Sequence, residues 1–507
     1  MKRLLLAAFL VAVAPLSRAQ QDPSPAHGEP ERATEQDRST PVPSAPARPY
    51  RIAPVERATL TNGMRLAAVR SARLPVVALE LALPFGGSAL DPQGREGLAD
   101  LVAALVREGA GSRDADAFAD AVAQLGASVS ASATPDALVV KVYSRRENLD
   151  QVLGLVADMV RRPALPDASL DRLRQETLAG LAAARGEPGG LAERRLNSLL
   201  YPDHPYGRSA DETSVAAVTR ADAVAAMARA SDPRGAVLAS AGDLSVDELR
   251  VMAERHFGDW AGSGALPALP ARLAAPVAGT AAGAPQPAPG LTIQVFDLPG
   301  SGQSAVRFGH LSITRDHPDF YAVRVLMEVL GGGQGRLHRN IREDKGWAYG
   351  AYAYLSPAAS AGALLAVTDV ETDRTADGLR EMIGELDRIR RDLVPAEELE
   401  RAKRYANGGF LRRQATTTGV AGQTLAAELS GLAPDEMARY RDRISAVTAQ
   451  ELLAAAQRHL RPGELSVVIA GDAARIYEPL SAIAPVSVFS PDGTPRPAPA
   501  PRAPGNG

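Results

Sequence analysis

The chain has 507 residues, of which 45% are hydrophobic and 23% are charged, and its formal net charge at pH 7 is −3. This length exceeds what one hydrophobic core usually organises, so the sequence predicts several packed modules. The small net charge and the absence of any Lys/Arg cluster argue against nucleic-acid binding. Because the chain has no cysteine, disulfides and thiolate metal sites are excluded.

Residues 1–19 have the pattern of a secretory signal peptide. Lys2 and Arg3 precede an apolar run from Leu4 to Leu16, and Ser17 and Ala19 place small residues before the expected cleavage point. The run is shorter than the ~20 residues that a membrane-spanning helix needs, and no other stretch comes closer, so no membrane span is predicted. The sequence therefore predicts a periplasmic or secreted protein.

Three segments rich in proline lack hydrophobic periodicity. Residues 20–52 are predicted to be a disordered tether and residues 486–507 a disordered tail. Residues 262–290, rich in Pro, Ala and Gly, are predicted to be an inter-domain linker. Two halves remain, residues 53–261 and 291–485, each of about the size of one or two compact units.

The two halves repeat one another at a constant offset. The triplet Ala217-Val218-Thr219 recurs 229 positions later as Ala446-Val447-Thr448, and the same offset relates Ala241-Gly242-Asp243 to Ala470-Gly471-Asp472. Both copies predict an amphipathic helix, a Pro/Gly turn and an apolar strand. An offset that holds through three elements indicates a duplicated α+β unit.

Local patterns predict further elements in each half. In the first half, Thr61-Asn62-Gly63 is a hairpin-turn signal, residues 76–83 are strand-like, and a helix begins near residue 97. In the second half, residues 291–296 and 305–313 are predicted strands, followed by a helix over residues 320–330.

Several motifs in this order resemble the M16 metallopeptidase family, which includes insulinase-like and processing-peptidase-like proteins. They are Leu60–Leu66, Gly86-Gly87-Ser88 with Gly97-Leu98-Ala99, His204–Arg208, Leu330–Gly333, Arg336-Leu337 and Arg342–Tyr349. The resemblance implies an α+β fold of two homologous M16-type halves arranged like a clam. Each half would have a mainly antiparallel sheet with packed helices.

M16 enzymes bind zinc through an H-x-x-E-H motif on a helix. The two histidines, four residues apart, share one helical face, and the glutamate is placed to activate water. In the corresponding helix of this chain, the metal-ligand positions are Asp100 and Ala104 and the general-base position is Ala103. The family's distal glutamate ligand aligns with Gly180. The helix keeps an apolar stripe of Leu98, Leu101, Val102 and Leu105. The resemblance therefore implies a retained scaffold without catalytic residues or a metal of its own.

No other metal or nucleophile site is predicted. None of the seven histidines pairs at i, i+4; the best grouping, His310 with Asp316 and His317, is interpreted as turn or surface residues. No G-x-S-x-G motif occurs.

Arg342 and Tyr349 are the most informative polar pair. A helix is predicted over residues 337–345, with Gly346 at its C′ position and a strand over residues 347–354. By residue chemistry alone, Arg342 would complement the helix dipole and Tyr349 would be a core residue. The resemblance implies that the two hydrogen-bond the backbone of an extended substrate opposite the zinc.

The loop Gly331-Gly332-Gly333-Gln334-Gly335 has two open interpretations. It lacks the Gly-Lys-Ser/Thr ending of a phosphate loop, so residue chemistry alone predicts a flexible connection between helices. The resemblance implies a glycine-rich loop near the substrate chamber of non-catalytic subunits.

Together these features predict a non-catalytic subunit of an exported M16-type zinc metalloendopeptidase. It would close the chamber and bind unfolded peptides for a partner subunit that carries zinc and H-x-x-E-H. The alternative is a stand-alone peptide-binding or structural pseudopeptidase, and an active peptidase with a rebuilt site is disfavoured by the missing ligands. The sequence leaves open the substrate and whether the assembly is a heterodimer or a homodimer.

Overall fold

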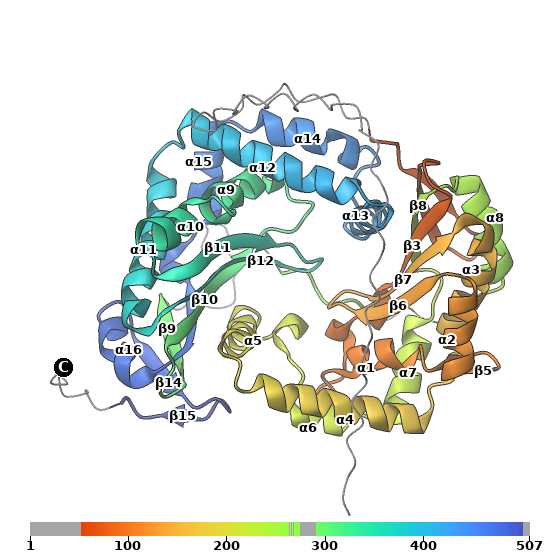
Figure 1. The fold of residues 1–507 in the computed structure, drawn as a ribbon, viewed down its shortest axis with the longest axis horizontal. Coiled ribbons are helices and arrows are strands. Elements are labelled where there is room, and N and C mark those ends of the chain that lie inside the picture. Colours follow the sequence, from red (N-terminus) through yellow and green to blue (C-terminus); the bar gives the residue numbers. More distant parts are fainter. Residues whose placement is uncertain (1–51, 263, 265, 267, 274–289, 500–507) are drawn as a thin grey trace, which may run out of the picture. The chain divides into compact units, whose positions relative to one another are not determined.

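The computed structural model describes residues 52–262, 264, 266, 268–273 and 290–499 (Figure 1). These residues belong to one compact unit, Arg51–Gly507. The predicted leader, nearly all of the predicted tether and most of the predicted linker lie outside the described residues. Within the described ranges, no helix is both long and apolar enough to cross a lipid bilayer.

The N-terminal half is built on a six-stranded sheet with the order β1-β2-β8-β3-β7-β6. Its strands are β1 (Glu56–Thr59), β2 (Arg65–Arg70), β3 (Val76–Leu83), β6 (Ser128–Ala133), β7 (Leu138–Arg145) and β8 (Val237–Gly242). All neighbours are antiparallel except β2 and β8. The predicted hairpin turn is confirmed: Gly63 has φ of 91°, which glycine adopts readily, and Asn62 accepts a hydrogen bond from the Met64 N–H.

The N-terminal half also contributes helices, all of which except α5 pack into the core on one face of this sheet. They are α1 (Leu98–Leu105), α2 (Ala115–Gln124), α3 (Leu149–Arg161), α4 (Asp167–Ala184), α5 (Pro188–Leu200), α6 (Glu212–Ala216), α7 (Arg220–Ala230) and α8 (Val246–Phe257). A small sheet pairs β4 (Gly109–Ala110) with β5 (Arg113–Asp114). Leu79 and Leu81 of β3 and Val140 of β7 share one core with α1, α3 and α8, as the alternation of strand side chains requires.

The C-terminal half has a seven-stranded sheet with the order β11-β12-β10-β13-β9-β14-β15. Its strands are β9 (Thr292–Asp297), β10 (Gln303–Ser312), β11 (Ala348–Ser356), β12 (Gly362–Glu371), β13 (Ser466–Gly471), β14 (Val486–Phe489) and β15 (Pro495–Arg496). Its helices are α9 (Phe320–Gly331), α10 (Arg336–His338), the π-helix η5 (Arg339–Asp344), α11 (Thr375–Arg391), α12 (Ala396–Gln414), α13 (Thr417–Leu429), α14 (Glu436–Ala446), α15 (Ala449–His459) and α16 (Ala473–Ser481).

The prediction of a disordered tail from residue 486 is wrong for its first part. Strand β14 pairs with β9 in parallel, and β15 pairs with β14. The Phe489 ring lies 5.8 Å from that of Phe296, so these residues extend the sheet and its packing. The high proline content after residue 490 concealed this short strand.

The predicted duplication is confirmed element by element. Val237, which begins β8, and Ser466, which begins β13, are 229 positions apart, as are Arg220 of α7 and Ala449 of α15. Both helices also begin with a capping box, in which the side chain of Thr219 or Thr448 accepts a hydrogen bond from the N–H three residues later.

The two halves are joined by reciprocal helices. Helix α5 of the N-terminal half packs Leu196 against Val468 of the C-terminal sheet. Helix α13, at the same 229-residue offset, packs Leu425 against Val237 of the N-terminal sheet. Each sheet therefore has one face covered partly by a helix from the other half. The apolar side chains buried there hold the two halves together.

A buried histidine links this fold to pH. His310 of β10 is 3% exposed; its Nδ1–H donates to the Leu311 carbonyl at 2.8 Å, and its Nε2 accepts from the Arg461 N–H at 3.3 Å. Burial, assisted by the positive charge of Arg461, lowers the pKa of His310 from 6.5 to about 4.

Stability should therefore fall between pH 6.5 and pH 4. In that window the unfolded chain binds a proton at His310 that the folded chain does not, so this contribution is complete above pH 6.5 and lost as pH falls through about 4. Its size is on the order of 3 kcal/mol. Urea unfolding at several pH values should show that the unfolding free energy of His310→Gln depends less steeply on pH. Some dependence should remain, because burial also lowers the pKa of His459. An unchanged slope would contradict this assignment.

Candidate functional site

The entry to helix α1 is fixed by a buried carboxylate. Asp91, 3% exposed, accepts hydrogen bonds from the N–H groups of Gly97 at 3.1 Å and Ala99 at 3.0 Å. Burial raises the pKa of Asp91 to about 6, although both N–H groups stabilise its charged form. Arg208, in the His204–Arg208 motif, donates to the carbonyls of Asp91 at 2.9 Å and Ala89 at 3.1 Å. These contacts explain why the helix keeps its position.

Another residue of the same motif connects the two halves. The Tyr206 hydroxyl donates a hydrogen bond to Asp136, in the turn between β6 and β7, and accepts one from the Ser360 N–H at 3.1 Å. The Ala359 N–H donates to Asp136 at 3.2 Å. The turn between β6 and β7 and the turn between β11 and β12 are thereby joined.

The positions assigned to the zinc motif lie on two helices: Asp100, Ala103 and Ala104 on α1, where the sequence predicts a helix, and Gly180 on α4, which packs against α1. Asp100 is exposed on α1, Ala104 is half-buried, and Ala103 is 2% exposed within the core. Solvent reaches Asp100, yet the surrounding protein desolvates it enough to raise its pKa. Gly180 is exposed on α4, and a Cβ there would have no other atom within 4 Å. The predicted stripe of Leu98, Leu101, Val102 and Leu105 is buried.

These residues do not fit a zinc ion. A structural or catalytic zinc site needs at least three His, Cys or carboxylate ligands, and the four positions offer one carboxylate, two methyl groups and a hydrogen.

Arg342 and Tyr349 meet at the surface. The Arg342 guanidinium carbon lies 4.6 Å from the centre of the Tyr349 ring, a cation–π contact. Tyr349 is 81% exposed, so its interpretation as a core residue is wrong. Within the described residues, neither side chain makes a hydrogen bond or an ion pair. The donors of both are therefore free for a ligand.

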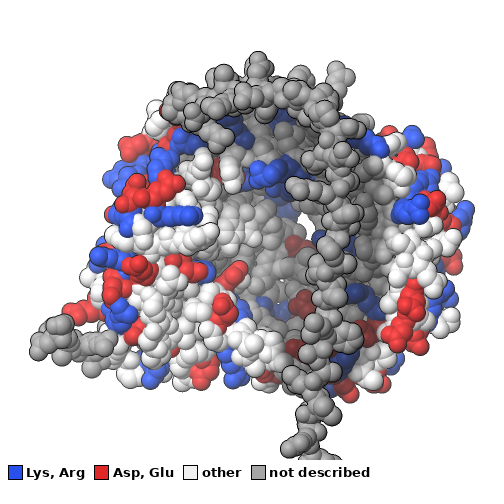
Figure 2. Space-filling view, viewed as in Figure 1, with Lys and Arg blue, Asp and Glu red and all other residues white. Residues whose placement is uncertain are grey.

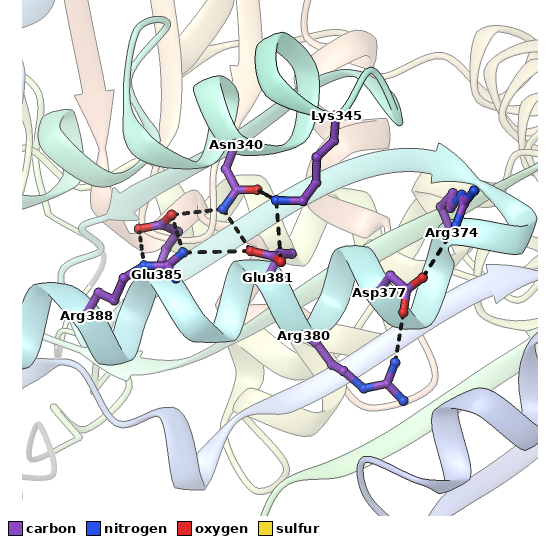
Figure 3. A network of polar contacts seen from close by, with 8 residues as sticks. All are labelled: Asn340, Lys345, Arg374, Asp377, Arg380, Glu381, Glu385 and Arg388. Atoms are coloured by element: carbon purple, nitrogen blue, oxygen red, sulfur yellow. Dashed lines mark hydrogen bonds and ion pairs between the residues drawn. The ribbon is translucent and has the colours of Figure 1, made fainter.

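A polar network holds the segment that carries Arg342. The predicted helix over residues 337–345 is a short α10 followed by the π-helix η5, and it ends at Gly346, which has φ of 68°. Figure 3 shows Asn340 of η5 between the acidic residues of α11; its Nδ2 donates to Glu381 at 3.0 Å and to Glu385 at 2.9 Å. Lys345 Nζ donates to Asn340 Oδ1 at 2.5 Å.

The sequence did not predict this network. Asn340 is 8% exposed, so its bonds to α11 fix one side of the π-helix inside the protein while Arg342 stays on the other side. Single π-turns recur at functional sites because they redirect side chains. An asparagine two residues before the arginine was the available signal, but nothing local to it specifies Glu381 or Glu385.

The glycines of the loop after α9 are explained mainly by close packing. A Cβ at Gly331 would lie 1.9 Å from the Ala353 nitrogen of β11, and one at Gly335 would lie 2.8 Å from the Gly332 nitrogen. At Gly332 it would meet Glu328 at 2.6 Å. A Cβ at Gly333 would be less crowded, because its nearest neighbour would be the Tyr405 hydroxyl at 3.2 Å. This tight turn replaces the predicted flexible connection.

Both large sheets expose an edge strand near these residues. Strand β6 ends the N-terminal sheet and packs beside α1, and β11, which carries Tyr349, ends the C-terminal sheet. An open edge presents unpaired N–H and C=O groups to which an extended peptide can add. The Ser/Ala alternation of β6 was the signal for this strand, and the sequence reasoning missed it.

A histidine cluster forms away from this site, and it shares His317 with the grouping made from the sequence, whereas Asp319 and His459 replace Asp316 and His310. Ligand atoms of His317, Asp319 and His459 lie within 4.8 Å of one another. Asp319 is bound to His459 at 2.6 Å and also pairs with Arg458. The Nδ1 atom of His317 accepts the Asp319 N–H at 3.0 Å. These contacts satisfy the cluster and tie the start of α9 to the end of α15.

Two family models match this chain. The model for insulinase (peptidase family M16) matches residues 67–214, and the model described as the peptidase M16 inactive domain matches residues 217–405. This chain belongs to the M16 family. The first matched segment contains α1 and the zinc-motif positions, and the second runs from the end of the N-terminal half into the C-terminal half, as far as α12.

Similar proteins include an uncharacterized zinc protease of Mycobacterium bovis, 27% identical over 372 residues, which covers 72% of this chain and 82% of that protein. Another from Streptomyces coelicolor is 26% identical over 436 residues, covering 82% and 90%. Among solved structures, a peptidase M16 inactive domain from Pseudomonas fluorescens has a TM-score of 0.74 and 26% identity, covering 82% of this chain and 98% of that one. The periplasmic protease PqqL of Escherichia coli shares the fold, with a TM-score of 0.68, 17% identity and coverage of 84% and 46%.

Proposed function

We propose that this M16 chain is the non-catalytic subunit of an exported zinc metalloendopeptidase, where it binds extended peptide for a zinc-bearing M16 partner. One contrast carries the proposal. Arg342 and Tyr349 are exposed and in contact, and neither side chain makes a hydrogen bond to any described residue, whereas the zinc-motif positions Asp100, Ala104 and Gly180 do not supply the ligands that a metal needs.

The supporting structure around Arg342 argues against a purely structural role. A tyrosine that stabilises the fold is expected to have its ring buried, whereas Tyr349 is 81% exposed. The π-helix instead uses a buried asparagine and two glutamates to hold a position from which Arg342 reaches solvent. Pre-organised donors of this kind suit an extended peptide, whose carbonyl oxygens accept hydrogen bonds from a guanidinium or a hydroxyl.

In this proposal each chain has a separate task. The partner's zinc would polarise the scissile carbonyl and activate water. Arg342 and Tyr349 would fix the peptide backbone, and the open edges of β6 and β11 would keep it extended. Export is part of the proposal and rests on the signal-peptide pattern of residues 1–19.

The second candidate is a stand-alone peptide-binding pseudopeptidase. It is favoured by the two open sheet edges and the free Arg–Tyr pair, which are present in a single chain. The two candidates differ in whether a zinc-bearing chain depends on this one.

The mature chain alone should contain no stoichiometric zinc and should leave unstructured peptides intact. An exported M16 chain with H-x-x-E-H from the same genome should hydrolyse those peptides efficiently only when this chain is added. Elemental analysis and fluorogenic-peptide assays of each chain and of the mixture provide the measurement. One tightly held zinc with chelator-sensitive cleavage by this chain alone would overturn the pseudoenzyme assignment. A partner that is equally active without this chain would favour the stand-alone candidate.

A further inference from the structure

A wide groove lies beside the open edge of the N-terminal sheet. It has a volume of about 900 Å³ and runs between the exposed face of β3, β7 and β6 and a wall formed by the C-terminal end of α12 and most of α13. Helix α13 covers the β8 and β3 side of that face, and the β7 and β6 side remains open. Tyr143, 39% exposed, lines the open part.

The groove carries an excess of positive charge. Lys141, Arg412 and Arg413 line it, against the single carboxylate of Glu80, which lies 3.9 Å from Lys141 Nζ. Over the described residues, Arg412 and Arg413 form no ion pair, although most arginines of this protein do. Elsewhere, Lys/Arg and Asp/Glu side chains are interspersed over the face shown in Figure 2. The N-terminus of α13, capped by Thr416, adds a positive helix end to the same groove.

Strand register connects these charges to the sheet edge. Ser128 and Ser130 of β6 line the groove and lie opposite Tyr143 and Lys141 of β7. A strand added to β6 would continue this register, so every second side chain of an added peptide would point into the groove. The spacing along the peptide would be about 6.6 Å.

Arg412 and Arg413 also lie in the last turn of α12, where basic residues complement the helix dipole. That role explains why these two positions carry positive charge. It does not explain why both side chains, with no carboxylate partner in the part of the chain that the structure describes, line the groove opposite Lys141.

We infer that this groove selects extended peptides with acidic side chains at alternate positions, which pair with Lys141, Arg412 and Arg413. The inference rests on the proposed function, because it names the class of peptide that the chain presents. Charge complementarity is the argument for this occupant: acidic side chains would supply the carboxylates that the two arginines lack.

Binding to the isolated full-length mature chain tests this directly. Fluorescence anisotropy would compare a short peptide with Glu at alternate positions, its Gln twin, and a peptide with the same number of Glu residues in consecutive positions. At low ionic strength the alternating acidic peptide should bind about tenfold tighter than the Gln twin, since each exposed charge pair contributes up to about 1 kcal/mol. The preference should disappear near 1 M salt, where the screening length is about 3 Å.

Matched variants locate the effect. R412Q/R413Q should remove most of the preference for the acidic peptide, because it leaves Lys141, whose charge Glu80 already opposes. R70Q/R73Q removes the same charge at exposed positions that do not line the groove and should change little. E80Q should strengthen acidic-peptide binding, because it removes the one opposing carboxylate.

Equal affinity for the acidic and Gln peptides, or an acidic preference that is undiminished in R412Q/R413Q, would overturn the inference. The absence of binding by every peptide would overturn it as well. None of these three results decides the proposed function, whose readout is zinc-dependent hydrolysis by two chains. A preference for the consecutive acidic peptide would show general charge attraction and reject the strand register.

Discussion

Replacing Arg342 by Ala, or Tyr349 by Phe, should lower peptide hydrolysis by the reconstituted pair on the order of 100-fold, with folding and association nearly unchanged. The expected size follows from geometry, because a scissile bond displaced by about 1 Å loses roughly that factor in rate. Stability should not respond, since Tyr349 is 81% exposed and neither side chain has a hydrogen-bond partner among the described residues.

Two neighbouring variants control for surface changes. R339A alters another arginine of the same π-helix, and Y354F removes a hydroxyl from a half-exposed tyrosine on the same strand. Both should hydrolyse peptide at close to the wild-type rate, and thermal melts of all four variants should agree closely. If R342A and Y349F each hydrolyse peptide at the wild-type rate, these residues do not bind substrate for the partner's active site. The stand-alone candidate would then be favoured.

The sequence could predict the features that depend on local pattern or on exact repetition. The 229-residue offset specified two similar halves because it ran unbroken through helix, turn and strand. Thr61-Asn62-Gly63 predicted its hairpin because only a few turn geometries join two strands that closely. The buried stripe of α1 followed from helical periodicity.

The features that sequence reasoning missed depend on contacts distant in the chain. The reciprocal packing of α5 and α13 requires knowing which sheet each helix faces, and an apolar stripe does not name its partner. Strand β14 is stabilised by pairing with β9, nearly 200 residues earlier (486 against 293), which overrides its proline-rich surroundings. The π-helix depends on Asn340 reaching α11.

The missing zinc ligands could be identified from the sequence, but their burial could not. Ala103 lies in the core, whereas Asp100, Ala104 and Gly180 keep some exposure. The general-base position is therefore packed inside the core, whereas the ligand positions are accessible. This difference separates two steps in any attempt to restore the site: metal ligands can be added at accessible positions, but the base must enter the core.

The triple variant D100H/A104H/G180E should accordingly bind about one equivalent of zinc and still fail to cleave peptide. His at 100 and 104 share a helical face, and Glu at 180 meets open space on the helix that packs against α1. Gly180→Glu should also favour helix α4 by several tenths of a kcal/mol, because glycine is a poor helix former. Elemental analysis and cobalt absorption spectra measure the metal, with D100H/A104H as the two-ligand control.

The two-ligand control should bind zinc about 100-fold more weakly, since the loss of even a supporting partner costs 10–100-fold. Adding A103E places a carboxylate at a 2% exposed position and should destabilise the chain by roughly 3 kcal/mol. Hydrolysis should therefore not return until that pocket is repacked. The variant D100H/A103E/A104H, which also lacks the distal carboxylate, should stay inactive for two separate reasons. Efficient chelator-sensitive cleavage by D100H/A103E/A104H alone would show that another residue supplies the third ligand and that Gly180 does not occupy that position.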